Sequence, residues 1–144
     1  MPITLRDITP ANWQQCIGLE PAPAQAHRIA SNLYSLAEAY VEPRLRPRAI
    51  YLGRRMIGFV MYEFDAENDC YWIPRFMIDA RCQGRGYGKR ALQAVIAALR
   101  DQRPDAPIML SITPDNAIAR HLYSSLGFVA TGHRRHGEEV LRLG

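Results

Sequence analysis

Short runs of apolar or alternating residues recur along the chain, and each one predicts a β-strand. A turn rich in glycine and arginine, residues 53–55, separates two of these runs and predicts a hairpin. The last two runs lie close together in sequence, and we expect them to form a strand pair. The predicted strands cover residues 3–8, 48–53, 56–64, 70–78, 108–112, 128–132 and 138–143.

Apolar residues spaced three or four apart predict helices between these strands. The clearest helix covers residues 87–102, and its apolar face comprises Leu92, Val95, Ile96 and Leu99. The resulting order, β-α-α-β-β-β-α-β-α-β-β, predicts an α/β fold with one mixed sheet and helices on both faces. The remaining predicted helices cover residues 11–19, 24–40 and 116–126.

The size and composition predict one domain. The chain has 144 residues, of which 48% are hydrophobic and 22% charged, so residues 1–144 can bury a core of their own. No apolar run reaches the length of a membrane span, and the N-terminal residues lack the pattern of a signal peptide. Cys16, Cys70 and Cys82 lack the spacing of metal ligands. We therefore expect reduced thiols, no metal site, no membrane partner and a cytoplasmic protein.

The formal net charge is +4, which by itself is compatible with nucleic-acid binding. The basic residues are scattered, however, and the one tight group, Arg81, Arg85, Lys89 and Arg90, surrounds a glycine-rich loop. A phosphorylated cofactor accounts for this group more simply than a nucleic-acid duplex does. We expect no nucleic-acid partner.

The glycine-rich loop, with Gly84, Gly86 and Gly88, joins a predicted strand to a predicted helix. Glycine lets the backbone bend tightly there, and the first N–H groups of the helix point outward with the positive end of its dipole. These features predict a phosphate-binding loop. Two common versions do not match, because the dinucleotide pattern needs glycine at Lys89 and the nucleoside-triphosphate pattern needs glycine at Gln83.

The pattern that matches is Q-x-x-G-x-G, formed by Gln83, Gly86 and Gly88. A second segment, from Asn116 to Phe128, is N-x-x-A-x-x-x-Y-x-x-x-G-F. In this order, and on these predicted elements, the two motifs resemble those of the GNAT superfamily of N-acetyltransferases. The resemblance implies a mostly antiparallel GNAT-like sheet, acetyl-CoA as cofactor and, as in many relatives, a homodimer.

The resemblance also implies a set of cofactor-binding residues. The loop would hold the diphosphate of acetyl-CoA, and the backbone of the preceding strand would pair with the pantetheine arm and polarise the thioester carbonyl. Asn116 would contact the same arm, although asparagine is equally suited to cap its helix, and both roles can hold. The residues concerned are Gln83, Gly84, Arg85, Gly86, Tyr87, Gly88 and Lys89 in the loop, and Phe76, Met77 and Ile78 in the strand.

Pro74 lies inside the strand predicted before the loop, where it cannot donate a ladder hydrogen bond. Prolines in sheets favour edges or bulges. In the superfamily this strand is distorted near its middle and splays from its neighbour, which admits the pantetheine arm. Pro74 is compatible with such a bulge and also with an edge strand.

Acetyl transfer to an amine requires a neutral amine, a polarised thioester carbonyl and a proton donor for the departing thiolate. The motif match makes Tyr123 our candidate for that donor. The alternative is a packing role, since Tyr123 lies on the apolar face of its predicted helix beside Leu122 and Leu126.

The base is harder to predict. The strands before the loop resemble most closely the polyamine and diamine acetyltransferase branch, in which an acidic residue commonly occupies the position of Pro74. We predict Glu63 as its substitute, with Asp65, Glu67 and Asp69 attracting a cationic amine. Two alternatives stay open: the acidic cluster is a solvated hairpin loop, and water chains remove the proton without a base.

The histidines are not chosen as catalytic residues. His121 should be exposed, because it points about 160° away from Tyr123 on a helix. His133 and His136 flank the last predicted turn and could line the acceptor pocket, but loop histidines are more often solvated. Cys82 lies in the loop, away from the expected position of the thioester, and predicts no covalent acetyl-enzyme.

Together these features predict a cytoplasmic acetyl-CoA-dependent N-acetyltransferase. The acceptor would be a small primary amine, with a polyamine as the candidate, and it would attack the thioester directly in a ternary complex. The alternative acceptor is a peptide or protein amine. The alternative from another class is a sensor that binds acetyl-CoA without turnover.

Overall fold

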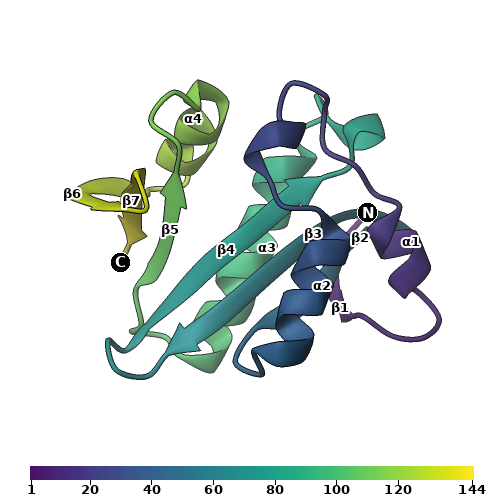
Figure 1. Cartoon of the computed structure of the whole chain (residues 1–144), viewed down its shortest axis with the longest axis horizontal. Coiled ribbons are helices and arrows are strands. Elements are labelled where there is room, and N and C mark those ends of the chain that lie inside the picture. The colour runs from purple at the N-terminus through teal and green to yellow at the C-terminus, as the bar shows by residue number, and fades with distance from the viewer.

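The computed structural model describes the backbone of residues 1–144 and every side chain except that of His27. One mixed sheet of seven strands, in the order β1-β2-β3-β4-β5-β7-β6, forms the centre of the molecule (Figure 1). All neighbouring pairs are antiparallel except β4 and β5. The strands are β1 (Ile3–Asp7), β2 (Arg46–Leu52), β3 (Arg55–Asp65), β4 (Cys70–Ile78), β5 (Ile108–Ile112), β6 (Val129–Arg135) and β7 (Glu138–Leu143).

The helices interleave with these strands in the predicted order. The α-helices are α1 (Trp13–Ile17), α2 (Asn32–Val41), α3 (Tyr87–Gln102) and α4 (Ala117–Ser125), and the short 3₁₀ helices are η1 (Ala26–Arg28) and η2 (Ala80–Cys82). The predicted fold class, with a mixed and mostly antiparallel sheet, is confirmed. None of the helices in the described chain is long and apolar enough to cross a membrane.

The prediction of one helix over residues 24–40 is wrong in its first half. The chain forms η1 there, becomes extended at Ile29, and starts α2 only after Ser31. The reason is a helix cap: the Ser31 hydroxyl accepts a hydrogen bond from the Tyr34 amide at 3.0 Å, while Ser31 itself has extended backbone angles. The segment before α2 is thereby free to cross toward the C-terminal half of the sheet.

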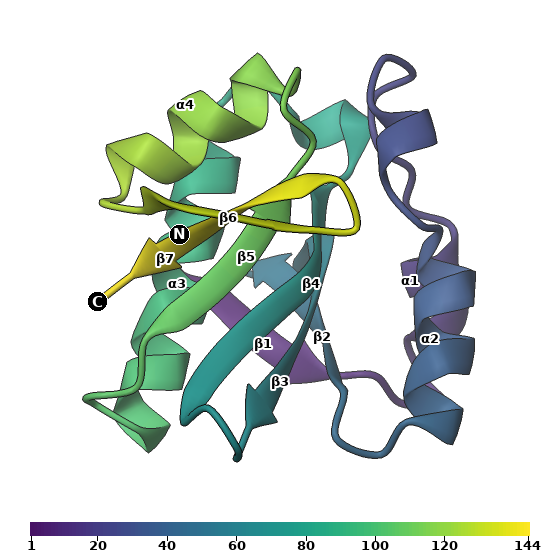
Figure 2. The same ribbon diagram turned by 60° about the vertical axis from the view of Figure 1, so that its left-hand side comes forward.

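Helices cover both faces of the sheet, as Figure 2 shows. On one face, the α3 residues Leu92, Val95 and Leu99 are fully buried in a core cluster that also includes residues of β5. On the other face, Cys16 of α1 and Leu36 of α2 pack in a second cluster against residues of β3. The sheet is therefore buried on both sides, which explains the apolar runs of its central strands.

A bulge at Pro74 changes the course of β4. Met61 pairs with Arg75 and Glu63 pairs with Trp72, so the single residue Tyr62 stands opposite two residues of β4, one of them Pro74. The bulge alternative is thus confirmed. On the other side of β4, pairing with β5 is limited to Tyr71 with Ile108 and Trp72 with Met109. Beyond Trp72 the two strands diverge and leave an opening in the sheet.

Candidate active site

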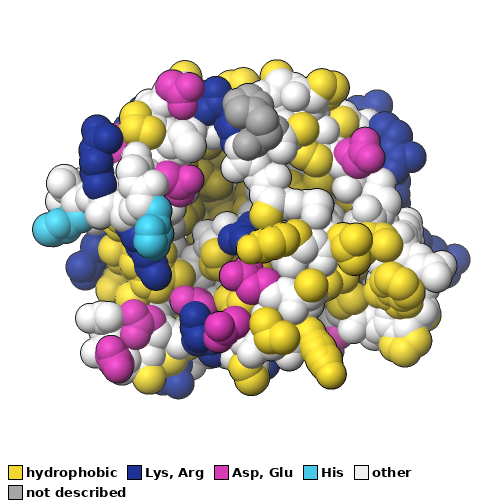
Figure 3. Space-filling view, in the orientation of Figure 1, with side chains coloured by type: hydrophobic (Ala, Val, Ile, Leu, Met, Phe, Trp, Pro, Cys, Tyr) yellow, Lys and Arg dark blue, Asp and Glu magenta, His cyan; other side chains and the backbone are white. Residues whose placement is uncertain are grey.

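A cavity of about 730 Å³ lies where β4 and β5 diverge. Residues of both strands line it, together with residues of the 83–88 loop, α4, the segment before α2 and the β6–β7 turn. Figure 3 shows the molecule hollowed here, with hydrophobic side chains on the floor of the hollow. Eleven of the thirteen predicted site residues line it: Glu63, Phe76, Met77, Ile78, Gln83, Gly84, Gly86, Tyr87, Gly88, Asn116 and Tyr123.

The loop at one end of the cavity has the backbone geometry that the motif predicts. Gly84 and Gly86 have φ angles of 77° and 76°, and a Cβ atom on either would meet nothing within 4 Å. Glycine is favoured at these two positions because the backbone is left-handed, and because a side chain would take up space that is open to a ligand. Close neighbours are not the reason. The Gln83 side-chain amide donates to the carbonyl of Ile78 at 2.9 Å and ties the loop to the end of β4.

The α3 helix starts inside this loop and has no side-chain cap at Gly86. Its first N–H groups have no intrahelical acceptor, so they and the helix dipole are available to an anion. Arg85 and Lys89 are exposed beside the loop and do not line the cavity. An open amide cradle flanked by two cations fits the diphosphate of acetyl-CoA.

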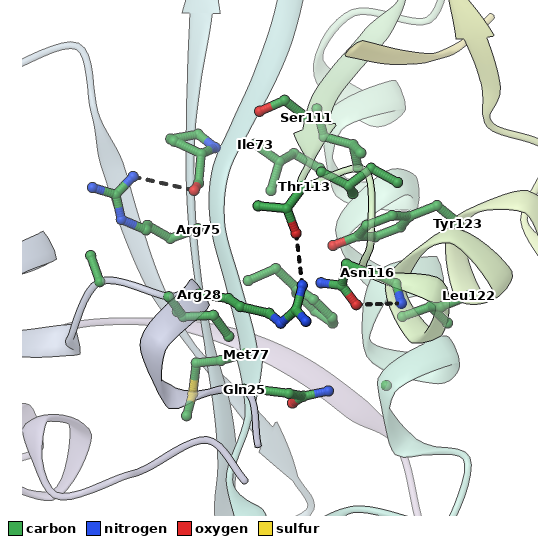
Figure 4. A pocket seen from close by; sticks show the side chains of 18 of the residues that line it. Gln25, Arg28, Ile73, Arg75, Met77, Ser111, Thr113, Asn116, Leu122 and Tyr123 are labelled. Carbon is green, nitrogen blue, oxygen red and sulfur yellow. Dashed lines mark hydrogen bonds between the residues drawn. The ribbon is translucent and has the colours of Figure 1, made fainter. Parts of the chain in front are cut away.

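The middle of the cavity fits the pantetheine arm. Because β5 no longer pairs with β4 beyond Trp72, the edge of β4 along Phe76 and Ile78 faces the opening. Asn116 caps α4, since its Oδ1 accepts from the Ala119 amide at 3.2 Å. The cap occupies only Oδ1, and the side chain still lines the cavity (Figure 4).

The position of Tyr123 suits both roles considered for it, packing and proton donation. Its ring packs edge-on against Phe128, with 5.7 Å between centroids, while Figure 4 shows its hydroxyl directed into the cavity toward Thr113. Burial raises the pKa of Tyr123 to about 12. The phenol is therefore protonated at neutral pH, which a proton donor must be.

The opposite end of the cavity contains the carboxylates Glu38, Glu63 and Glu138. The Glu63 side chain is mostly buried, with 15% exposed, and accepts from Arg44 Nε at 2.9 Å. This contact is the first cause of a raised pKa of Arg44. Glu38 accepts from Arg75 Nη2 at 3.1 Å. These internal ion pairs mean that an incoming cation must compete with arginine.

The three acidic residues at the β3–β4 turn, Asp65, Glu67 and Asp69, do not line the cavity. The Asp65 carboxylate accepts from the amides of Glu67 and Asn68 and from the Asn68 side chain, and it thereby shapes the β3–β4 turn. The Asn68 side chain is the first cause that lowers the pKa of Asp65. Glu67 and Asp69 are exposed. The solvated-loop alternative accounts for this cluster.

Arg28 is the site residue that sequence reasoning missed. It reaches across the cavity from η1, and its Nη1 donates to Thr113 Oγ1 at 2.9 Å (Figure 4). The same Nη1 donates to Asp115 Oδ1 at 2.9 Å. Its hydrogen bond and charge lower the pKa of Asp115. No pattern around Arg28 could have indicated this, because the contact depends on the break between η1 and α2.

His121 and Cys82 lie where they were expected, and His136 has the cavity-lining position that was the alternative for it. His121 and His133 are exposed, whereas His136 lines the cavity from a turn in which its φ angle is 53°. Cys82 is buried in η2 and does not line the cavity. In the described part of the chain, no cluster of three or more His, Cys, Asp or Glu residues could hold a metal ion.

Comparisons with known proteins agree with this geometry. The model of the acetyltransferase (GNAT) family matches residues 8–128. A spermine/spermidine N(1)-acetyltransferase from Bacillus subtilis is 32% identical over 98% of this chain and 97% of its own length. The alignment thus spans nearly the full length of both chains.

Solved structures share the fold at low sequence identity. The PaiA N-acetyltransferase from Thermoplasma acidophilum, in complex with coenzyme A, superimposes with a TM-score of 0.73 at 13% identity, covering 99% of this chain and 98% of the other. The ribosomal-protein-S18-alanine N-acetyltransferase from Escherichia coli gives 0.73 at 22% identity, with 97% and 90% covered. From its family match and its site geometry, this chain belongs to the acetyltransferase (GNAT) family of N-acetyltransferases that use acetyl-CoA.

Proposed function

We propose that this enzyme transfers the acetyl group of acetyl-CoA to a primary amine of a small polyamine. The observation that carries the proposal is one continuous cavity with an amide-lined loop at one end and carboxylates at the other. An anion-binding end and a carboxylate-lined end are what a CoA thioester and a cationic amine require. The name of the Bacillus subtilis relative supports this acceptor class. The fold alone does not select it, since an enzyme named for a protein alanine shares the fold.

Each part of the cavity has a proposed role in binding or catalysis. The loop residues Gln83 to Lys89 hold the diphosphate, the edge of β4 at Phe76, Met77 and Ile78 aligns the arm and the carbonyl, and Asn116 contacts the arm. Tyr123 donates its proton to the departing thiolate. Glu63 remains our sequence-based prediction for the base, although it must first release Arg44.

Direct attack in a ternary complex is part of the proposal. Cys16, Cys70 and Cys82 are all free and buried, and none of them lines the cavity. Initial rates measured over both substrates should therefore give intersecting double-reciprocal lines. Parallel lines would indicate a covalent acetyl-enzyme and would contradict this mechanism.

The acceptor is tested by release of the CoA thiol with spermidine, spermine, a short diamine and a peptide amine in parallel. We expect the polyamines to stimulate release most strongly, measured as kcat/KM. Release with the peptide alone would move the enzyme to the protein-amine class. Tight binding of acetyl-CoA with no acceptor-stimulated release would favour the sensor alternative.

We also propose that the protein is cytoplasmic, in accord with the free thiols. We propose in addition that it forms a homodimer. The outer face of α2 carries exposed apolar side chains, namely Leu33, Tyr34, Tyr40 and Val41 (57, 60, 79 and 74% exposed). Figure 3 shows hydrophobic side chains over this helix. A second copy would cover them. Sedimentation equilibrium should give twice the mass of the chain, and Leu33→Glu should shift it to one mass; a wild-type monomer would exclude the dimer.

A further inference from the structure

Glu138 differs from the other carboxylates of the cavity. Glu38 and Glu63 each accept from an arginine, whereas Glu138 has no ion pair with any side chain that the structure describes. Its Oε1 accepts a hydrogen bond from Ser111 Oγ at 2.6 Å. Glu138 therefore keeps a carboxylate oxygen available to a ligand without first displacing a cation.

The cationic residue paired with Glu138 in the β6–β7 ladder contacts an aromatic ring and not this carboxylate. Arg135 stands opposite Glu138 at the end of the β6–β7 hairpin. Its guanidinium lies over the ring of Trp72, 4.4 Å from the ring centroid. This cation–π contact occupies the arginine, and it fixes the hairpin against β4 at the place where β4 and β5 separate.

Ser111 places this carboxylate at the reacting end of the cavity. It lies on β5 between Met109, the last residue paired with β4, and Thr113. Ser111 on β5 and Thr113 just after it both line the cavity, and Figure 4 shows Ser111, Thr113 and Tyr123 around the same space. A thioester whose diphosphate is bound at the loop would have its acetyl group at this end, beside Tyr123.

We propose that Glu138, positioned by Ser111, is the catalytic carboxylate that takes the proton from the acceptor amine; this inference rests on the proposed function. The ammonium group loses one proton to Glu138, which passes it to solvent. The neutral nitrogen then forms the N–C bond to the acetyl carbon, and the C–S bond breaks as Tyr123 gives its proton to sulfur. The second proton of the nitrogen restores Tyr123, so each turnover releases one proton.

This assignment takes the role of base from Glu63 and gives the two carboxylates different tasks. Glu138 accepts the proton, while Glu63, once released by Arg44, would contact a remote part of the acceptor. The other charged or titratable groups at this end of the cavity are Arg28, Arg135, His136 and Tyr123, and Arg28 is held by Thr113 and Asp115. Arg135 is stacked on Trp72 and Tyr123 holds its proton at neutral pH, so His136 is the other side chain here that could accept a proton, and the test must separate its role from that of Glu138.

The test compares Glu138→Gln, which keeps an oxygen for the Ser111 hydroxyl, with Glu63→Gln and His136→Gln. The matched control is Glu139→Gln, since Glu139 is the next residue, pairs with Arg120 and does not line the cavity. The readout is kcat/KM for spermidine from pH 6 to 10, together with the Kd for CoA. Each variant is first checked for folding by its thermal transition.

We expect Glu138→Gln to lower kcat/KM for spermidine by about 10² at pH 7 with CoA affinity unchanged. The loss should shrink about tenfold per pH unit up to the pKa of the free amine, because only neutral amine then reacts. Ser111→Ala should lose several-fold, and Glu138→Asp should recover part of the activity.

Wild-type turnover together with an unaltered pH profile in Glu138→Gln would overturn the inference and leave the proposed function intact. The inference also fails if Glu63→Gln or His136→Gln alone reproduces the altered profile. Absence of turnover with every amine in the wild type would instead reject the proposed function, and this inference with it.

Discussion

The two ends of the cavity would recognise their proposed ligands in different ways. At the cofactor end, one continuous segment offers backbone N–H groups, and its open glycines have left-handed φ angles. At the acceptor end, side chains come from α2, β3, β7 and the loops between them, and most of their charges are already paired. Backbone recognition demands a fixed local pattern, whereas side-chain recognition tolerates many residue types. The first end is therefore specified locally and the second only by the fold.

The largest expected effect is at the cofactor end. Gly86→Val should weaken CoA binding on the order of 10³-fold, measured by calorimetry, because a β-branched residue is strained at this φ and its side chain enters the ligand space. Gly132→Val is the control, since Gly132 has a φ of 84°, equally open surroundings and no place in the cavity lining. Equal weakening in both variants, or unchanged affinity in Gly86→Val, would show that the loop is misassigned.

Tyr123 is where the two ends meet, and its removal should separate chemistry from binding. Tyr123→Phe should lower kcat by about 10² while the Kd for CoA changes less than about twofold, as expected for loss of a proton donor. Tyr71→Phe serves as the control, because Tyr71 is a buried tyrosine that donates to Gln102 away from the cavity. Equal losses of turnover and affinity would make Tyr123 a packing residue.

The same tyrosine predicts a pH dependence of stability. Its pKa is raised from 10 to about 12 in the folded protein, so the unfolded chain loses the proton first. The contribution of protonated Tyr123 to the free energy of unfolding is fully present below pH 10. It is lost as the pH rises toward 12, at about 1.4 kcal/mol per pH unit. Denaturant unfolding at these pH values should show the wild type losing about 2 to 3 kcal/mol relative to Tyr123→Phe. Parallel curves would contradict the raised pKa.

Asp79 directly follows β4 and anchors the chain at the start of the loop at the cofactor end. It is 3% exposed and accepts from the Glu20 amide at 3.0 Å and from Arg81 Nε at 2.8 Å. Burial acts to raise the pKa of Asp79, but these hydrogen bonds and the Arg81 charge outweigh it and lower the pKa. The contribution of ionised Asp79 to the free energy of unfolding is present above about pH 4. It is lost as the pH falls through the lowered pKa.

Asp79→Asn should therefore cost about 1 to 3 kcal/mol of unfolding free energy at pH 7, and the difference from wild type should shrink in acid. Urea unfolding at pH 7 and pH 3 measures both values. The exposed Asp101 on α3 is the control position, at which the asparagine variant should be close to wild type. A difference that persists undiminished in acid would argue against the ionised carboxylate.

The smallest effect belongs to the acceptor end. Arg44→Ala removes the cation that competes for Glu63, so the KM for spermidine should fall about 2- to 5-fold with kcat and CoA affinity nearly unchanged. Steady-state kinetics at low and high salt measure it. Arg46→Ala is the control, because Arg46 donates only to the Pro43 carbonyl and does not line the cavity. A rise in KM would mean that Arg44 itself binds the acceptor.

The sequence by itself determined the fold and the cofactor end. The spacing of apolar residues in strands and helices follows from which residues face the core. The order of the elements could therefore be predicted, and so could β4 and α3 themselves. The glycines of the loop mark its left-handed backbone positions. Tertiary structure alone decided the acceptor end. Ser31 interrupts the predicted helix, which lets Arg28 cross the opening. The β6–β7 hairpin brings Glu138 to Ser111, 27 residues away in sequence. Such contacts depend on where the chain returns in space, and no local pattern of residues encodes that return.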